Sequence, residues 1–164
     1  MFYSMNMSDQ RRYVEKAGVM LELLGLPRMV GRTLGGLLTA PAQGASAAEL
    51  AELLQASRAS LSTALRQLTL MGLIEQLPKA GGREQRYRVK PGCWATLTEQ
   101  GNRKLETFRD LATEGLAALP PGADPGALRE MESFYAVWLE LFPKMLDEWR
   151  RVQAEKLRGE GGQT

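Results

Sequence analysis

The sequence contains no histidine and only one cysteine, Cys93, among its 164 residues. Histidine is the commonest general base and the commonest metal ligand in proteins, so its absence removes the usual residue for both kinds of site. A single cysteine can form neither an intrachain disulfide nor a zinc site built from clustered cysteines. The sequence also lacks a phosphate-binding loop and an HExxH motif. We therefore expect no catalytic residues, no metal site and no cofactor.

The sequence has no long uninterrupted apolar run. Its most apolar stretch, residues 17–42, is interrupted by Glu22, Pro27, Arg28 and Arg32, which favours two core helices over a membrane span. The basic residues near the N-terminus follow apolar residues instead of preceding them, so this stretch does not resemble a targeting signal. A lone cysteine is typical of a reducing compartment. These features predict a cytoplasmic protein without a membrane partner.

The charge of the chain is concentrated in its middle. The formal net charge is only +2, but residues 57–90 carry seven cations against two acids, Glu75 and Glu84. This segment therefore has a local charge of +5, and the rest of the chain sums to −3. A basic segment in an otherwise mildly acidic protein is typical of a nucleic-acid contact surface. A solvated charged surface is the alternative, so the motifs within the segment must decide.

Two helices are expected first, over residues 9–24 and 27–39, after a disordered tail over residues 1–7. Gly25 and Pro27 are typical of a helix end followed by a helix start. The second helix contains Gly31, Gly35 and Gly36, which are costly in an isolated helix and so indicate close packing against a neighbour. The first helix has apolar residues at helical spacing: Tyr13, Ala17, Met20, Leu21 and Leu24.

The segment 46–72 has the pattern of a helix-turn-helix. Ser46 and Glu49 form a capping box at the start of a helix over 47–54. Gln55 and Ala56 make a tight turn, and Ser57 caps the next helix, which is expected over 58–71 with a glycine after it.

The helix 58–71 separates into an apolar face and a polar face. Its predicted buried side is formed by Leu61, Ala64, Leu65 and Leu68. The opposite side carries small or hydroxylated residues and two longer ones: Ala59, Ser60, Ser62, Thr63, Arg66 and Gln67. Small residues let a helix enter the major groove of DNA closely, and Arg and Gln can each make paired hydrogen bonds to base edges. A solvated helix face more often carries Glu and Lys, so the composition favours insertion into DNA.

A basic hairpin, or wing, is expected over residues 73–90. Leu73, Ile74 and Leu77 predict one strand, a turn with two glycines follows, and residues 83–90 predict the return strand. Period-two alternation in the return strand places Arg86, Arg88 and Lys90 on the face opposite Gln85, Tyr87 and Val89. A basic wing after a helix-turn-helix can reach phosphates or a minor groove. An edge strand protected from aggregation by its cations is the alternative.

The predicted DNA contacts divide by role. Arg66 and Gln67 are expected to contact bases, and Ser60, Ser62 and Thr63 share their helix face. Phosphate or minor-groove contacts are expected from six residues: Ser57, Arg58, Lys79, Arg83, Arg86 and Arg88.

From Tyr13 to Trp94 the sequence resembles the GbsR/MarR-type winged-helix transcriptional regulators. The resemblance rests on VEKAGVMLELLGLPRMVGR (14–32), SAAELAELL (46–54), SRASLSTALRQL (57–68), GLIE (72–75) and the arginine-rich wing. It implies a cytoplasmic homodimer that is often a repressor and that in some members responds to a small molecule. The glycine-rich second helix departs from the family pattern, and the C-terminal third is only loosely similar.

The C-terminal part predicts two further helices, over residues 96–119 and from about 127, separated by the break PPGADPG (120–126). Apolar residues of the last helix are spaced by alternating steps of 3 and 4: Leu128, Met131, Tyr135, Trp138, Phe142, Met145, Trp149 and Val152. Together with Tyr13 they are the predicted dimer interface. Pro143 is expected to kink or split this helix. The aromatic stripe could instead form a cage for a cationic ligand, although such stripes are more often core.

The whole sequence predicts a mainly α fold with a small β-hairpin wing. Its winged helix-turn-helix domain would span 8–92 and its helical dimerisation region 93–158, with a tail over 159–164. The expected function is sequence-specific binding of double-stranded DNA by a homodimer that represses transcription at an inverted repeat, with an effector of unknown identity. Two alternatives are a winged-helix protein-interaction module and a ligand-binding dimer that has lost DNA binding. A redox-sensing Cys93 is a further hypothesis, although isolated cysteines are usually inert.

Overall fold

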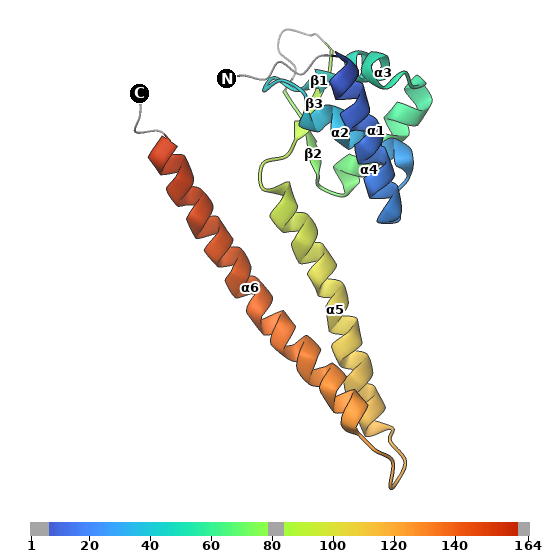
Figure 1. The fold of residues 1–164 in the computed structure, drawn as a ribbon, viewed down its shortest axis with the longest axis vertical. Helices are drawn as coiled ribbons and strands as arrows, with labels where there is room; N and C mark the ends of the chain where they lie inside the picture. The colour runs from blue at the N-terminus through green and yellow to red at the C-terminus, as the bar shows by residue number, and fades with distance from the viewer. Residues whose placement is uncertain (1–6, 79–83, 161–164) are drawn as a thin grey trace. The chain divides into compact units, whose positions relative to one another are not determined.

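Six helices and one three-stranded antiparallel sheet are formed by the residues that the structure describes, 7–78 and 84–160. The structure is a computed structural model, shown as a ribbon in Figure 1. The chain divides into two compact units, the first ending at Leu97 and the second beginning at Thr98. The first turn of α5 therefore belongs to the first unit. In chain order the elements are α1 (Met7–Leu23), α2 (Arg28–Leu38), β1 (Ala45–Ser46), α3 (Ala47–Leu54), α4 (Arg58–Leu70), β2 (Ile74–Gln76), β3 (Arg86–Val89), α5 (Cys93–Ala117) and α6 (Gly126–Glu160).

The helices α1 and α2 pack against each other through small residues. A Cβ atom added at Gly31 would lie 2.8 Å from the carbonyl oxygen of Ala17, and one added at Gly35 would lie 2.8 Å from the Ala17 Cβ. Both distances are below van der Waals contact, so the glycines are needed for this close approach, as the sequence predicted.

The buried face of α1 differs from its predicted stripe. Val14 and Gly18 are its buried residues, whereas Tyr13, Met20 and Leu24 are exposed. The prediction selected large apolar side chains, but α2 meets α1 with glycines and therefore accepts small residues there.

The helix-turn-helix is formed as predicted. The backbone N–H of Glu49 donates to the Ser46 hydroxyl at 3.2 Å, and the Glu49 carboxylate accepts from the backbone N–H of Ser46 at 2.8 Å. Gln55 has a left-handed backbone (φ +48°) in the turn between α3 and α4. The Ser57 hydroxyl then caps α4 by accepting from the backbone N–H of Ser60. These local bonds set where α3 begins, and the left-handed Gln55 and the Ser57 cap set where α3 ends and α4 begins.

The buried face of α4 is the predicted one, formed by Leu61, Ala64, Leu65 and Leu68. These side chains join the core of the first unit, which also contains buried residues of α2, α3 and the first turn of α5. Full burial of each leucine contributes roughly 1.5–3 kcal/mol. The opposite face of α4 is therefore held toward solvent.

The sheet has the order β1-β3-β2, so the return strand of the wing lies at its centre. Ser46 pairs with Arg86 on one side of β3, and Glu75 pairs with Arg88 on the other. The return strand covers Arg86–Val89 and is shorter than the predicted 83–90. Tyr87 and Val89 pack against the core, which agrees with the predicted alternation.

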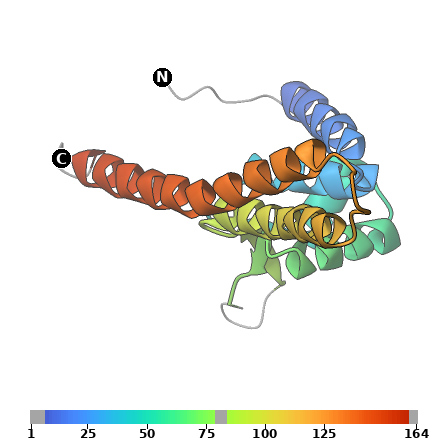
Figure 2. The same ribbon diagram turned by 90° about the horizontal axis from the view of Figure 1, so that it is seen from below.

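In the second unit, α5 and α6 run antiparallel, and Figures 1 and 2 show them side by side near the loop that joins them. The rings of Phe108 and Tyr135 stack with centroids 5.1 Å apart, and the Trp138 indole N–H donates to the Asn102 side chain at 2.8 Å. Pro143 lies inside α6, which continues to Glu160, so the proline does not split the helix. The tail predicted from residue 159 is therefore helical at its start.

The eight regularly spaced apolar residues of α6 that were predicted as dimer contacts face two directions. Five of its residues are buried or half-buried: Leu128, Met131, Tyr135, Phe142 and Val152. Three are exposed: Trp138, Met145 and Trp149. Leu146 is buried next to the exposed Met145, because a helix of 3.6 residues per turn drifts away from a strict seven-residue repeat. Within a single chain these residues are therefore buried only in part, and their role as the dimer interface stays a prediction.

The aromatic residues of the second unit pack on one another. The rings of Phe134 and Tyr135 meet edge to face at 5.2 Å, and Phe134 stacks on Trp138 at 6.4 Å. Rings that cover each other's faces support the packing interpretation over a cation cage. Among the described residues, no helix is both long enough and apolar enough to span a membrane.

Candidate nucleic-acid interface

The polar face of α4 lies on the surface of the first unit. Five of the predicted contact residues on α4 are exposed: Arg58, Ser60, Ser62, Thr63 and Arg66. Its N-cap Ser57 is also exposed, and Gln67 is half-buried. Neither Arg58 nor Arg66 has an ion pair among the described residues. Both guanidinium groups therefore have all their donors available for an anionic or hydrogen-bonding partner.

The hydroxyl groups of this face are oriented by the helix backbone. The Thr63 hydroxyl donates to the Ala59 carbonyl at 3.1 Å, and the Ser60 hydroxyl lies at hydrogen-bond distance from both the Ser57 carbonyl (3.0 Å) and the Ser57 hydroxyl (2.9 Å). A hydroxyl has a single hydrogen, so its remaining function here is to accept. The amino groups of cytosine and adenine are the donors on base edges in the major groove. These two residues are thus suited to accept from such bases.

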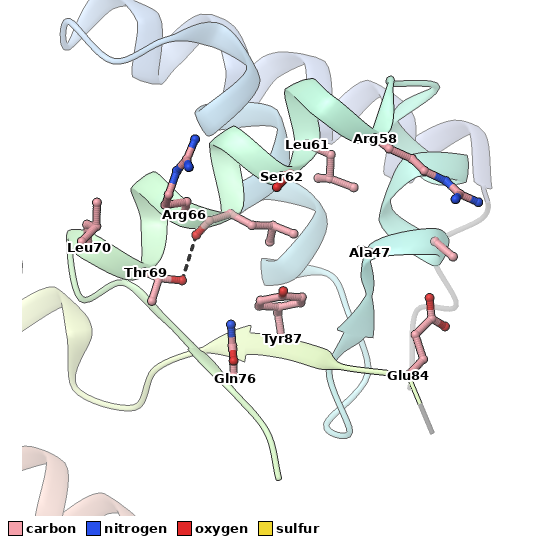
Figure 3. A pocket seen from close by; sticks show the side chains of 12 residues that line it. Ala47, Arg58, Leu61, Ser62, Arg66, Thr69, Leu70, Gln76, Glu84 and Tyr87 are labelled. Atoms are coloured by element: carbon pink, nitrogen blue, oxygen red, sulfur yellow. Dashed lines mark hydrogen bonds between the residues drawn. The ribbon is translucent and has the colours of Figure 1, made fainter. Parts of the chain in front are cut away.

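A recess of about 600 Å³ lies between α4 and the sheet. Figure 3 shows Tyr87 and Gln76 of the sheet on the side of the recess opposite α4. The recess combines cationic, polar and apolar side chains with one acid, Glu84. Most of its lining was not predicted as site residues, including Thr69, Leu70, Gln76 and Tyr87. Thr69 and Leu70 could have been found from helical spacing, but Gln76 and Tyr87 depend on where the sheet lies.

Leu70 is the apolar exception on the outer side of α4. Its side chain is 81% exposed, and Figure 3 shows it projecting from the same side of the helix as Arg66. An apolar side chain in this place can contact the methyl group of thymine. It could equally contact an apolar residue of another protein.

Two wing arginines are bonded within the first unit. The Nη2 atom of Arg86 donates to the Gly44 carbonyl at 2.8 Å and to the Glu49 carboxylate at 2.7 Å, and Nε donates to the Gln43 carbonyl at 3.1 Å. Arg88 forms an ion pair with Glu75 at 2.7 Å. The sequence predicted both arginines as phosphate or minor-groove contacts, yet most of the Arg86 donors are directed inward.

The tip of the wing was predicted to contact DNA through Lys79 and Arg83. Both lie outside the described residues. Lys90, at the other end of β3, is exposed.

The carboxylate of Glu49 is stabilised in its charged form. Its pKa is lowered most by the hydrogen bond from the backbone N–H of Ser46. Burial, the next largest effect, raises the pKa, and the hydrogen bond and charge of Arg86 lower it further. This negative charge lies at the N-terminus of α3, where the helix dipole also favours it.

Cys93 lies in the core, only 1% exposed. Burial raises the pKa of its thiol, which disfavours the reactive thiolate. Both facts oppose the redox-sensor hypothesis.

Two segments of the chain match family models. Residues 24–84 match the model described as MarR family, and residues 92–153 match the model described as MmpR5-like MarR family transcriptional regulator. The HTH-type transcriptional regulator MmpR5 of Mycobacterium tuberculosis is 37% identical over 130 residues, which cover 78% of this chain and 79% of that protein. The chain belongs to the MarR family. A crystal structure described as a transcriptional regulator is similar to this MarR-family chain, with 34% identity and a TM-score of 0.67, covering 87% of this chain and 99% of the other.

Family membership confirms the MarR part of the predicted resemblance, whereas the GbsR subtype stays a prediction. The winged-helix fold class is confirmed by the similar crystal structure. The MarR-family chain is thus a transcriptional regulator, a class of protein that is not enzymatic.

Proposed function

We propose that this MarR-family regulator represses transcription by binding an inverted-repeat operator as a homodimer. The observation that supports the proposal most directly is the exposed polar face of α4, on which Arg58 and Arg66 have no ion pair within the described chain. A helix with small residues at its N-terminus and unpaired arginines can enter a major groove and bind base edges. Membership of a family of transcriptional regulators agrees with this use of the helix.

In the proposed complex, Arg66 and Gln67 contact bases, and Thr63 and Ser60 accept hydrogen bonds from base amino groups. Ser57 and Arg58, at the start of α4, contact the phosphate backbone, because the N-terminus of a helix favours anions. Lys79 and Arg83 keep their proposed role at the tip of the wing. Arg88 reaches the backbone only if its pair with Glu75 opens.

The proposed homodimer is supported by apolar side chains left exposed in the second unit. On α6 they include Phe134, Val137, Trp138, Leu141, Met145 and Trp149. An exposed apolar stripe of this length is typical of a protein interface, and a second copy of the same helix is self-complementary to it. A two-fold dimer of winged helices places its recognition helices about 34–36 Å apart, one turn of DNA.

Selection of bound sequences from a random pool of DNA duplexes tests the proposal. We expect an enriched inverted repeat whose half-sites are about one helical turn apart. Enrichment of a single half-site would support DNA binding but contradict binding as a homodimer. The absence of any enriched sequence would contradict the proposed function.

A protein-interaction module is the second candidate, and exposed Leu70 is the observation that favours it. The same selection separates the two candidates, because an interaction module enriches no DNA sequence. If the protein is an interaction module, Leu70→Ala should abolish partner binding. If it is a DNA-binding protein, Leu70→Ala should still bind the selected site.

A small-molecule effector is also part of the proposal, as the family resemblance implies. Its chemical class is open. Release of the wild-type protein from its selected duplex by a compound, with no release of an equally tight unrelated DNA-binding protein, would establish such an effector.

A further inference from the structure

We infer that Glu49 and Arg86 form a latch that positions the wing for DNA binding without contacting DNA themselves. The inference rests on the proposed function, since it concerns how the wing is presented to DNA. It assigns Arg86 a positioning role in place of the phosphate contact expected from the sequence.

Arg86 connects the wing to two other segments of the first unit. Its guanidinium group binds the carbonyl oxygens of Gln43 and Gly44 in the loop before β1, and it binds the carboxylate of Glu49 on α3. Arg86 itself lies on β3, opposite Ser46 of β1. The latch therefore ties the central strand of the wing to the start of the helix-turn-helix, across 37 residues of sequence.

The same oxygen of Glu49 serves both the helix cap and the wing. Oε2 accepts from the backbone N–H of Ser46 at 2.8 Å and from Nη2 of Arg86 at 2.7 Å. The position of that oxygen is fixed by the capping box, so the capping box also fixes where Arg86 can lie. A wing attached in this way keeps a set position relative to α3 and, through the tight turn, to α4.

Gly44 reinforces the attachment of β3. Its backbone is left-handed (φ +74°), and a Cβ atom added there would collide with the backbone carbonyl of Tyr87 on β3. The loop can thus approach β3 closely enough for its carbonyl to reach Arg86. Two independent features, a glycine contact and a charged hydrogen-bond network, hold the same strand.

For the loss of the Glu49 charge, the latch and simple electrostatics predict opposite changes in DNA affinity. Removing an acidic charge from a DNA-binding domain should strengthen binding to the polyanion. Neutralising Glu49 instead releases the wing, so the latch predicts weaker binding. The conservative test is Glu49→Gln, because glutamine can still complete a capping box while losing the charge that holds Arg86.

The experiment measures binding to a duplex recovered by selection and to a random-sequence duplex of equal length, across a series of salt concentrations. We expect Glu49→Gln and Arg86→Gln each to weaken binding roughly threefold to tenfold, a range suited to a partly exposed charged hydrogen bond. The double variant should bind no more weakly than Arg86→Gln alone, because both changes break one connection. The salt slope of Arg86→Gln should equal that of Glu49→Gln, because both variants release the same wing and neither removes a phosphate contact of residue 86.

Two matched controls separate the latch from general effects on α3. Ser46→Ala removes the capping hydroxyl but keeps both the backbone N–H bond that holds the Glu49 carboxylate and the Glu49–Arg86 pair, so its DNA affinity should stay near that of the wild type. Glu52→Gln removes an exposed acid from the same helix that has no ion pair among the described residues, and its binding should be unchanged or slightly tighter.

Two results would overturn the latch. One is a Glu49→Gln variant that binds as tightly as the wild type. The other is an Arg86→Gln variant whose salt slope lies about 0.9 below that of Glu49→Gln, as loss of a phosphate contact by Arg86 itself requires. If the wild type binds no selected DNA, the proposed function fails, and amide hydrogen exchange then tests the latch separately. Backbone amides of β3 should exchange faster in Glu49→Gln than in the wild type, with those of α4 unchanged; equal exchange in β3 would reject the latch.

Discussion

The two units of the chain differ in how they bury their apolar residues. The first unit encloses large side chains completely, among them Leu50, Leu54, Leu61 and Leu68. In the second unit Phe142 and Leu146 are the largest buried side chains of the described residues, while other large apolar residues of α6 stay exposed, among them Phe134, Trp138 and Trp149. The first unit therefore has a core of its own. The second has an apolar surface suited to a partner, and we therefore propose DNA binding for the first unit and dimerisation for the second.

The largest expected effect comes from the core of the first unit. Leu68 is fully buried on α4, with a relative exposure of 0%, and Leu68→Ala should lower the free energy of unfolding by about 2–5 kcal/mol. Leu70→Ala, two residues away on the exposed side, should change it by no more than about 0.5 kcal/mol. Urea denaturation of both variants measures the difference. Similar losses in the two variants would contradict the assigned faces of α4.

The apolar stripe of α6 should control the oligomeric state. Leu141 is 54% exposed, and Leu141→Glu would place a charge in the proposed interface, so we expect mainly monomers. Gln153→Glu adds the same charge at an exposed polar position of α6 and should stay dimeric. Light scattering at matched protein concentrations distinguishes them. A dimeric Leu141→Glu variant would show that the two copies pair through another surface.

Arg66 should determine sequence preference without affecting the second unit. Arg66→Ala should cost about 1–3 kcal/mol on the selected site and relax the preference for the base it contacts. Arg103→Ala removes an exposed arginine from α5 and should leave DNA affinity almost unchanged. Both are measured by titration of labelled duplexes at fixed salt. Wild-type affinity in Arg66→Ala would remove Arg66 from the base-reading positions.

The smallest effect concerns acid stability of the first unit. The pKa of Glu49 is lowered in the folded state from its ordinary value of 4.5, so its charged form stabilises the fold above that value, and this contribution is lost as pH falls through the folded pKa. Glu49→Gln should therefore be slightly less stable than the wild type at pH 7, and the difference should be smaller at pH 3. Urea denaturation at both pH values measures it. A difference that is unchanged at low pH would show that the carboxylate charge does not contribute.

The parts of the fold that could be predicted from sequence depend on residues close together in the chain. The capping box of Ser46 and Glu49, the cap of Ser57 and the buried face of α4 are all set within one or two helical turns. The glycines of α2 were also interpreted correctly, because their cost in a helix is itself local information.

The parts that could not be predicted depend on contacts between distant segments. The sequence alternation placed Arg86 on a basic face, but the pairing of Ser46 with Arg86 brings it to Glu49 instead. The inward side of α1 was missed because small residues pack there. The burial of Leu146, which lies outside the predicted pattern of α6, was missed because it depends on what packs against that helix.

The most direct test of the account changes the distance between half-sites of the selected operator. Two α4 helices held by one dimer must meet two major grooves on the same side of the duplex. Inserting five base pairs rotates one half-site by about half a turn and should abolish tight binding, whereas inserting ten should restore part of it. Equal affinity for the original site and the five-base-pair insertion would contradict a dimer that presents two recognition helices.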